Sequence, residues 1–219
     1  MKASDETSLS DLIALKLRNA IILGKLSPGT SLIESGLCKQ YQASRNTIRV
    51  ALHQLRYEGL ADYVLNRGAQ VRVLTQSDIH DIYKVRHTLE LSAIQNSSFA
   101  DDRHFSNIDK ILIAGEEAVR EDRWNAVGTS SLFFHQAIVG LLNSERLDAY
   151  FNTILAQLRL IFAMSKNEKW FQGNWLEKDR RIFTHLVAGQ RLEAVELMRL
   201  YLYDSETHVS NIVRAHTSQ

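Results

Sequence analysis

Side chains that could read DNA cluster in one predicted helix near the N-terminus. Arg49 lies opposite the apolar face of this helix, and Arg45 flanks it in the first turn. A guanidinium group can donate two hydrogen bonds to O6 and N7 of one guanine in the major groove. Asn46 could read adenine or bind phosphate, while Thr47 and Ser44 suit phosphate oxygens near a helix N-terminus. This chemistry predicts sequence-specific contacts with duplex DNA.

The same helix has an apolar face that would hold it against a core. Ile48, Leu52 and Leu55 recur at helical spacing, and Ser44 is placed to cap the N-terminus. Ser35 is predicted to cap a shorter helix that precedes it. The two helices predict a helix-turn-helix.

A small β-wing is predicted after the helix-turn-helix. Two short strands, Ala61–Leu65 and Ala69–Leu74, are joined through Asn66, Arg67 and Gly68, where glycine permits a tight turn. Arg67 at the tip could enter the adjacent minor groove. The predicted DNA-contacting residues are Ser35, Ser44, Arg45, Asn46, Thr47, Arg49, Arg67 and Gly68.

Charge is distributed unevenly along the chain. Residues 1–75 hold 10 Lys and Arg against 6 Asp and Glu, whereas residues 76–219 hold 16 against 19. A basic first part and an acidic second part fit a DNA-reading domain of residues 1–75 and a separate sensing and assembly domain of residues 76–219. The wing and this basic balance favour DNA binding over the alternative, in which the polar helix face is merely solvated.

Composition excludes several classes of protein. The 219 residues are comfortable for two domains, and no apolar run reaches the roughly 18 residues that a membrane span needs. The N-terminus is polar and lacks the apolar region of a signal peptide. A single cysteine, Cys38, excludes an internal disulfide framework. We expect a cytoplasmic protein without a membrane partner.

The second part of the chain has almost entirely helical periodicity. Thr75 and Asp78 form an N-terminal capping signature, and no proline follows Pro28. The predicted helices span residues 77–99, 106–121, 129–142, 145–165, 173–188 and 191–211. The fold class is therefore predicted to be mainly α, with an N-terminal winged helix-turn-helix followed by an all-helical effector-binding bundle.

Several polar residues of this bundle fall within apolar helix faces. Burying one such group without a partner costs on the order of 1–3 kcal/mol, so side chains on separate helices are expected to meet one another or a polar ligand. Taken singly, Arg86 could pair with Glu90, His135 could be a satisfied core histidine, and Tyr201 could be a core ring. As a group they favour a polar cavity. The predicted ligand-binding residues are Arg86, Ser131, His135, Asp179 and Tyr201.

The first part of the chain resembles the winged-helix domain of GntR-family bacterial transcriptional regulators. The resemblance rests on four motifs in matching order, Leu26-Ser-Pro-Gly29, Ser44-Arg-Asn-Thr-Ile-Arg49, Glu58-Gly-Leu60 and Asn66-Arg-Gly68. The family usually has Thr-Pro where this chain has Asn and Thr at positions 46 and 47. The resemblance implies DNA binding, with an altered target preference.

The second part resembles the FCD effector domain of the FadR branch of the same family, on the motifs Val85-Arg86-x-x-Leu89-Glu90 and Phe134-His135. Many members hold a divalent metal through an aspartate and three histidines. The matching positions here are Ser131, His135, Asp179 and Tyr201. His135 and Asp179 alone fall short of the three or four ligands of a stable site, so no cofactor or tightly bound metal is expected.

These features predict a transcriptional repressor that binds a palindromic operator as a homodimer. Such dimers place two recognition helices about 34 Å apart. A small carboxylate-like effector would bind Arg86, His135 and Tyr201, since a carboxylate suits a guanidinium fork. No nucleophile–base pair or phosphate loop supports an enzyme, and no catalytic residue is predicted. Two alternatives stay open: a metal-dependent enzyme built on His135 and Asp179, and an architectural DNA binder without an effector.

Overall fold

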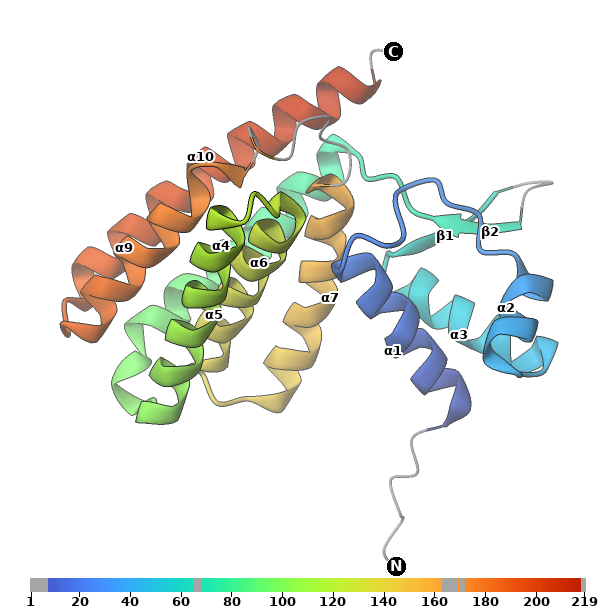
Figure 1. The fold of residues 1–219 in the computed structure, drawn as a ribbon, viewed down its shortest axis with the longest axis horizontal. Coiled ribbons are helices and arrows are strands. Elements are labelled where there is room, and N and C mark those ends of the chain that lie inside the picture. Colours follow the sequence, from blue (N-terminus) through green and yellow to red (C-terminus); the bar gives the residue numbers. More distant parts are fainter. Residues whose placement is uncertain (1–7, 65–67, 163–168, 170–171, 218–219) are drawn as a thin grey trace, which may run out of the picture. The chain divides into compact units, whose positions relative to one another are not determined.

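The computed structural model describes residues 8–64, 68–162, 169 and 172–217 (Figure 1). The chain divides into two compact units, Met1–Val73 and Leu74–Gln219. Each unit has its own hydrophobic core. The first unit carries the predicted DNA-reading helix and the second carries the predicted ligand-binding residues.

The first unit is a helix-turn-helix built on α1 (Leu9–Ile22), α2 (Glu34–Tyr41) and α3 (Arg45–Tyr57). The apolar face of α3 packs against α1, and its residues Ile48 and Leu52 are wholly buried. This burial anchors α3, because an exposed helix of this length would be marginal in water. The predicted helix-turn-helix is confirmed.

The wing follows as an antiparallel pair of strands, β1 (Ala61–Val64) and β2 (Gly68–Val71). Ala61 lies opposite Val71, and Val64 lies opposite Gly68. Ser31 adds an isolated antiparallel bridge to Gln70 of β2. The predicted wing is confirmed with shorter strands, and its tip at residues 65–67 lies outside the described residues.

The capping predictions in this unit differ in outcome. The Ser44 hydroxyl accepts a hydrogen bond from the Thr47 amide at 3.1 Å, so Ser44 caps α3 as predicted. The prediction that Ser35 caps α2 is wrong, because α2 begins two residues earlier than a Ser35 cap requires and has Ile33 at its N-cap without a side-chain hydrogen bond. The cause is tertiary: the Leu32 amide donates to the Ala69 carbonyl at 2.8 Å, and this pairing ends immediately before the helix.

The second unit is an all-helical bundle in its described part, as predicted. Its long helices lie side by side, with α5 packed on α6 and α10 packed on both α4 and α9 (Figure 1). The elements are α4 (Gln76–Gln95), a short 3-10 helix η1 (Ser97–Phe99), α5 (Asp102–Arg120), α6 (Trp124–Gly140), α7 (Glu145–Phe162), α9 (Trp175–Val187) and α10 (Arg191–Thr217).

The helix ends in this unit follow local side chains. Thr75 and Asp78 form a reciprocal capping box at the start of α4, as predicted. The predicted helix 77–99 is interrupted at Asn96, whose side-chain amide donates to the Ser92 carbonyl at 2.8 Å and satisfies the end of α4. A side chain that donates to a backbone carbonyl of the preceding turn in this way competes with continuation of the helix.

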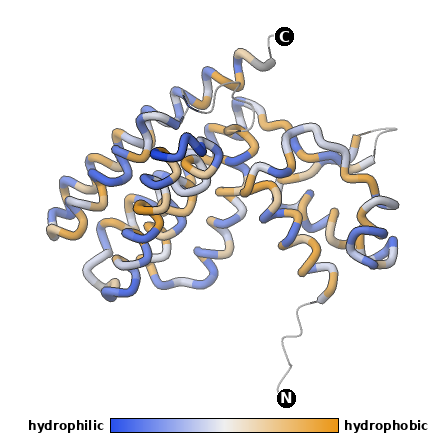
Figure 2. The backbone as a smooth tube through the Cα atoms, in the orientation of Figure 1, coloured by the Kyte–Doolittle hydropathy of each residue, from blue (hydrophilic) through white to orange (hydrophobic). Residues whose placement is uncertain are grey.

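Hydrophobic and hydrophilic residues alternate along the helices of both units (Figure 2). The apolar stripes account for the buried core, and the polar stripes face solvent. Within the described ranges, every helix is too short or too polar to cross a lipid bilayer.

The close approach of α5 and α6 depends on a glycine. A Cβ added at Gly115 would lie 2.7 Å from Ser130 Oγ and 2.8 Å from Leu176 Cδ1. The Ser130 hydroxyl donates to the Ile111 carbonyl at 2.6 Å and cannot move aside without losing that hydrogen bond. We therefore expect Gly115→Ala to lower the free energy of unfolding by about 1–3 kcal/mol.

The measurement is urea unfolding followed by tryptophan fluorescence, since all three tryptophans lie in the second unit. Gly140→Ala is the matched control, because an added Cβ there meets only Asp148 Oδ1 at 3.8 Å. That control should be neutral or stabilising by up to about 1 kcal/mol. Equal effects of the two substitutions would contradict the packing argument.

Candidate functional site

The polar face of α3 is exposed on the first unit. Arg45, Asn46 and Arg49 are all exposed, while the opposite face of the helix is buried. The hydroxyls of Ser44 and Thr47 lie 2.8 Å apart at the helix N-terminus. The structure thus brings these five predicted residues together on the first turns of one anchored helix.

The remaining predicted DNA-contacting residues lie on neighbouring elements. Ser35 is exposed in the first turn of α2. Gly68 begins β2 with a φ of +75°, a value that favours glycine. Arg67 lies outside the described residues.

One residue beside α3 was missed by the sequence analysis. Glu34, the first residue of α2, accepts hydrogen bonds from Arg49 Nε at 3.0 Å and 3.1 Å with its two carboxylate oxygens. The hydrogen bond and the charge of Glu34 raise the pKa of Arg49. The pKa of Tyr63 on β1 is also raised, mainly by burial and secondly by the negative charge of Glu34. An acid in a first helical turn is common, so the sequence gives no signal for this contact.

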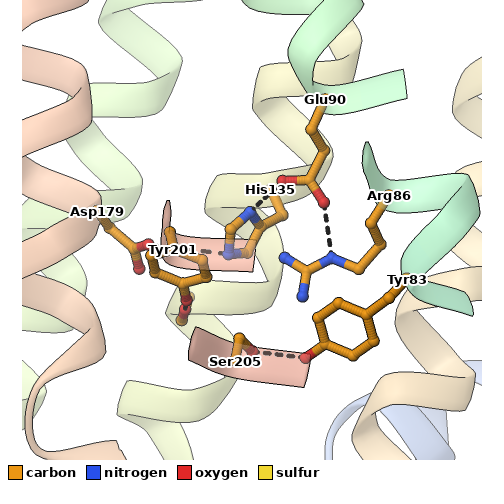
Figure 3. A network of polar contacts seen from close by, with 8 residues as sticks. Tyr83, Arg86, Glu90, His135, Asp179, Tyr201 and Ser205 are labelled. Atoms are coloured by element: carbon orange, nitrogen blue, oxygen red, sulfur yellow. Dashed lines mark hydrogen bonds and ion pairs between the residues drawn. The ribbon is translucent and has the colours of Figure 1, made fainter. Parts of the chain in front are cut away.

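In the second unit, four helices bring the predicted ligand-binding residues together (Figure 3). Arg86 comes from α4, Ser131 and His135 come from α6, Asp179 comes from α9, and Tyr201 comes from α10. All of them are buried. The Ser131 and Tyr201 hydroxyls lie 3.3 Å apart. Residues that are far apart in the sequence therefore form one polar cluster.

Glu90 of α4 organises this cluster (Figure 3). Its Oε1 accepts from Arg86 Nε at 2.7 Å, and its Oε2 lies 2.6 Å from His135 Nδ1. Burial alone would raise the pKa of Glu90, but the charges and hydrogen bonds of Arg86 and His135 outweigh burial and lower it. Glu90 is therefore ionised and acts only as an acceptor.

The protonation state of His135 follows from this contact. Because ionised Glu90 only accepts, His135 Nδ1 must carry a hydrogen. Burial lowers the pKa of His135, although Glu90 opposes this, so the ring is neutral near pH 7. Its Nε2 then presents a lone pair and acts as a hydrogen-bond acceptor.

Asp179 faces this lone pair without a hydrogen-bond donor of its own. Its Oδ1 lies 3.8 Å from His135 Nε2, and neither carboxylate oxygen has a hydrogen-bond partner among the described residues. Burial raises the pKa of Asp179 well above its ordinary range; the nearby Ser131 and Tyr201 hydroxyls and the Arg86 charge oppose that rise, although neither hydroxyl reaches hydrogen-bond geometry with the carboxylate. Two facing acceptors favour either a proton on Asp179 or a ligand that donates to both.

A small cavity adjoins the cluster. It has about 10 Å³ open to the centre of a water molecule, which is room for one water. Arg86 Nη2 also lacks a hydrogen-bond partner among the described residues. A larger guest requires the wall to move, and Phe162, Gln172 and Trp175 form part of that wall. The sequence analysis missed these three residues because they are ordinary apolar or amide side chains outside the polar pattern.

The residues of this cluster do not fit a divalent metal. Across the described ranges no group of three or more His, Cys, Asp and Glu side chains could hold a metal ion. Ser131 and Tyr201 contribute neutral hydroxyls, which are poor substitutes for imidazole or carboxylate ligands. The guanidinium of Arg86 lines the same cavity and would repel a cation.

Comparison with known proteins covers both units. Residues 9–71 match the model of the bacterial regulatory proteins of the gntR family, and residues 81–204 match the model of the FCD domain. The solved structure of a GntR transcriptional regulator from a Rhodococcus species aligns with a TM-score of 0.85 and 33% identity. That alignment covers 93% of this chain and 98% of the other.

Two curated relatives are more distant. The gluconate operon transcriptional repressor of Bacillus licheniformis is 29% identical over 143 residues, which are 65% of this chain. The match spans only 58% of the length of that repressor. The HTH-type transcriptional regulator BphR of Paraburkholderia xenovorans is 22% identical over 208 residues, covering 90% of this chain and 84% of the relative.

The raised pKa of Asp179 predicts a pH-dependent stability. A carboxyl group whose pKa is higher in the folded state stabilises the fold at low pH, and this contribution is lost as pH rises through the folded pKa. We therefore expect Asp179→Asn, without added ligand, to be more stable than the wild type at about pH 8 by on the order of 1 kcal/mol or more.

The measurement is the unfolding free energy of both proteins between about pH 4 and pH 8, and the difference should shrink as pH falls. A variant that is less stable than the wild type by the same amount at every pH would show that the Asp179 carboxylate is a satisfied structural group.

Proposed function

The chain belongs to the GntR family of bacterial transcriptional regulators and carries an FCD domain, and from this premise we propose a repressor that binds a palindromic operator as a homodimer. A small carboxylate effector bound in the second unit controls it. The protein acts in the cytoplasm, where its DNA target lies.

The proposal of operator binding rests on the exposed polar face of α3. Arg45, Asn46 and Arg49 project from a helix whose Ile48 and Leu52 are wholly buried. An anchored helix can hold these groups in register with base edges, while Ser35, Ser44, Thr47, Arg67 and Gly68 supply phosphate and wing contacts. Residues 1–75 form the proposed DNA-binding domain.

The effector site in residues 76–219 is supported by buried polar groups of Arg86, His135 and Asp179 that have no hydrogen-bond partner among the described residues. Arg86 Nη2 offers a donor to a carboxylate, and the hydroxyls of Tyr201 and Ser131 line the same cavity. His135 Nε2 and the Asp179 carboxylate offer acceptors to other groups of the effector. A purely structural bundle has little reason to bury such groups, which argues against an architectural DNA binder without an effector.

Control of DNA binding requires that the effector prefer one arrangement of the dimer. A ligand that binds two arrangements equally shifts neither. Helix α4 is the natural transmitter, because it carries Arg86 and Glu90 and begins at Gln76, soon after the wing ends at Val71. We infer that the segment Val73 to Asp78 couples the two domains. A metal-dependent enzyme has no support, since the family and the relatives are transcriptional regulators.

Arg49→Ala tests the reading helix. The substitution removes one bidentate base contact, so specific binding should weaken by about 1–3 kcal/mol in each half-site. The measurement is a gel-shift titration on an operator selected from a random DNA library with the wild-type protein. Arg120→Ala is the control, because it removes the same charge from an exposed position on α5. Undiminished specific binding by Arg49→Ala would overturn the assignment of α3.

Tyr201→Phe tests the effector site. A screen of small carboxylates should find a compound that raises the melting temperature, since an effector at about 100 times its Kd stabilises the fold by about 2.7 kcal/mol. Removing the buried Tyr201 hydroxyl should abolish most of that shift. Tyr203→Phe is the matched control, because Tyr203 lies on the same helix and is 68% exposed as a residue. An unchanged shift in Tyr201→Phe, or a shift produced only by divalent metals, would contradict this site.

A further inference from the structure

We propose that Glu34 is a specificity-determining residue: its carboxylate holds the Arg49 guanidinium so that the two terminal nitrogens face one guanine of the operator. This inference rests on the proposed operator binding and goes beyond it, because it assigns a base preference to a residue outside the reading helix. Glu34 acts through Arg49 and is therefore a positioning residue.

The geometry of the pair selects one way of reading a base. Both carboxylate oxygens of Glu34 accept from Arg49 Nε, at 3.0 Å and 3.1 Å. Arg49 makes no other hydrogen bond among the described residues, so Nη1 and Nη2 are available to a ligand. These two nitrogens form the end of the guanidinium fork, which matches O6 and N7 of guanine. Arginine can also bind a base through Nε and one terminal nitrogen. Arg49 cannot use this second mode while its Nε donates to Glu34.

Stability does not explain why Glu34 forms this contact. The Arg49 side chain is 59% exposed and that of Glu34 is 30% exposed, and ion pairs in water contribute little to folding. A negative charge beside a DNA-binding helix also repels phosphates and weakens binding to every sequence. A contact that adds little to the fold and opposes general DNA affinity can still favour one base over the others by orienting Arg49.

The orientation of Arg49 supplies that discrimination. A free arginine side chain can reach any phosphate oxygen, whereas one fixed at Nε loses less conformational freedom when it meets a guanine in the right place. The pair should therefore favour guanine strongly at one position of each half-site.

A purely structural role is the competing explanation. Glu34 is the first residue of α2, where a carboxylate interacts favourably with the helix dipole. Loss of that interaction would weaken the fold of the first unit and lower the affinity for all DNA sequences equally. Base discrimination separates the two explanations, because only a positioning role predicts a change at one base pair.

The experiment measures binding of full-length wild type, Glu34→Gln and Asp62→Asn to the selected operator, to its single base-pair variants and to random duplex DNA. Asp62→Asn is the charge-matched control: it also removes one acid from the first unit, and its contact with Arg72 at 3.9 Å is loose. We expect Glu34→Gln to lose about 10-fold or more of the preference for guanine at one position per half-site. Its affinity for random duplex should be equal or higher, as in Asp62→Asn.

A double-mutant cycle completes the test. In an Arg49→Ala background, Glu34→Gln should cause no further loss of discrimination, because the residue it positions is gone. An equal loss of affinity for every sequence, or a change at a base pair that Arg49→Ala does not affect, would overturn the inference. Failure of the wild type to select any sequence would instead overturn the proposed function, and the inference with it.

Discussion

A carboxylate that accepts from the inner nitrogen of a neighbouring side chain fixes the orientation of the functional groups in both units. Glu34 accepts from Arg49 Nε on the first unit, and Glu90 accepts from Arg86 Nε in the second. The other carboxylate oxygen of Glu90 accepts a hydrogen bond from His135 Nδ1. In each case the outer nitrogens are left to face a ligand. In the proposed DNA-reading and effector sites, these acids orient the groups that would meet the ligand and need not touch it themselves.

The two acids act in very different surroundings. The pair of Glu34 and Arg49 is in contact with water, where its energy is small and salt screens it. Arg86 and Glu90 are buried, so removing one partner leaves an uncompensated charge at a cost of about 3–5 kcal/mol. The exposed pair can therefore form and break at little cost in free energy, whereas the buried pair is a permanent part of the bundle. This difference suits a surface that must release its ligand and a cavity that must hold one shape.

Sequence periodicity predicted the helix faces and caps that depend on nearby residues, whereas contacts between distant residues set the other features. The buried face of α3 with Ile48 and the capping box of Thr75 follow from spacing along one helix. The start of α2 does not, because it is set by pairing between Leu32 and a distant strand. The contact of Glu34 joins residues on two helices and leaves no local signal. Apolar faces likewise predicted that polar groups meet in the bundle, but not that the cavity among them is so small.

The facing acceptors in the second unit tie ligand chemistry to folding energy. His135 Nε2 and the Asp179 carboxylate cannot satisfy each other unless Asp179 takes a proton, because both present lone pairs. Keeping them buried lowers the stability that apolar side chains would give at the same positions. A guest that donates a hydrogen bond removes this penalty, so part of its binding energy comes from the protein rather than from new contacts. Because Glu90 on α4 fixes the tautomer of His135, the proposed effector would act through His135 on the helix that follows the wing.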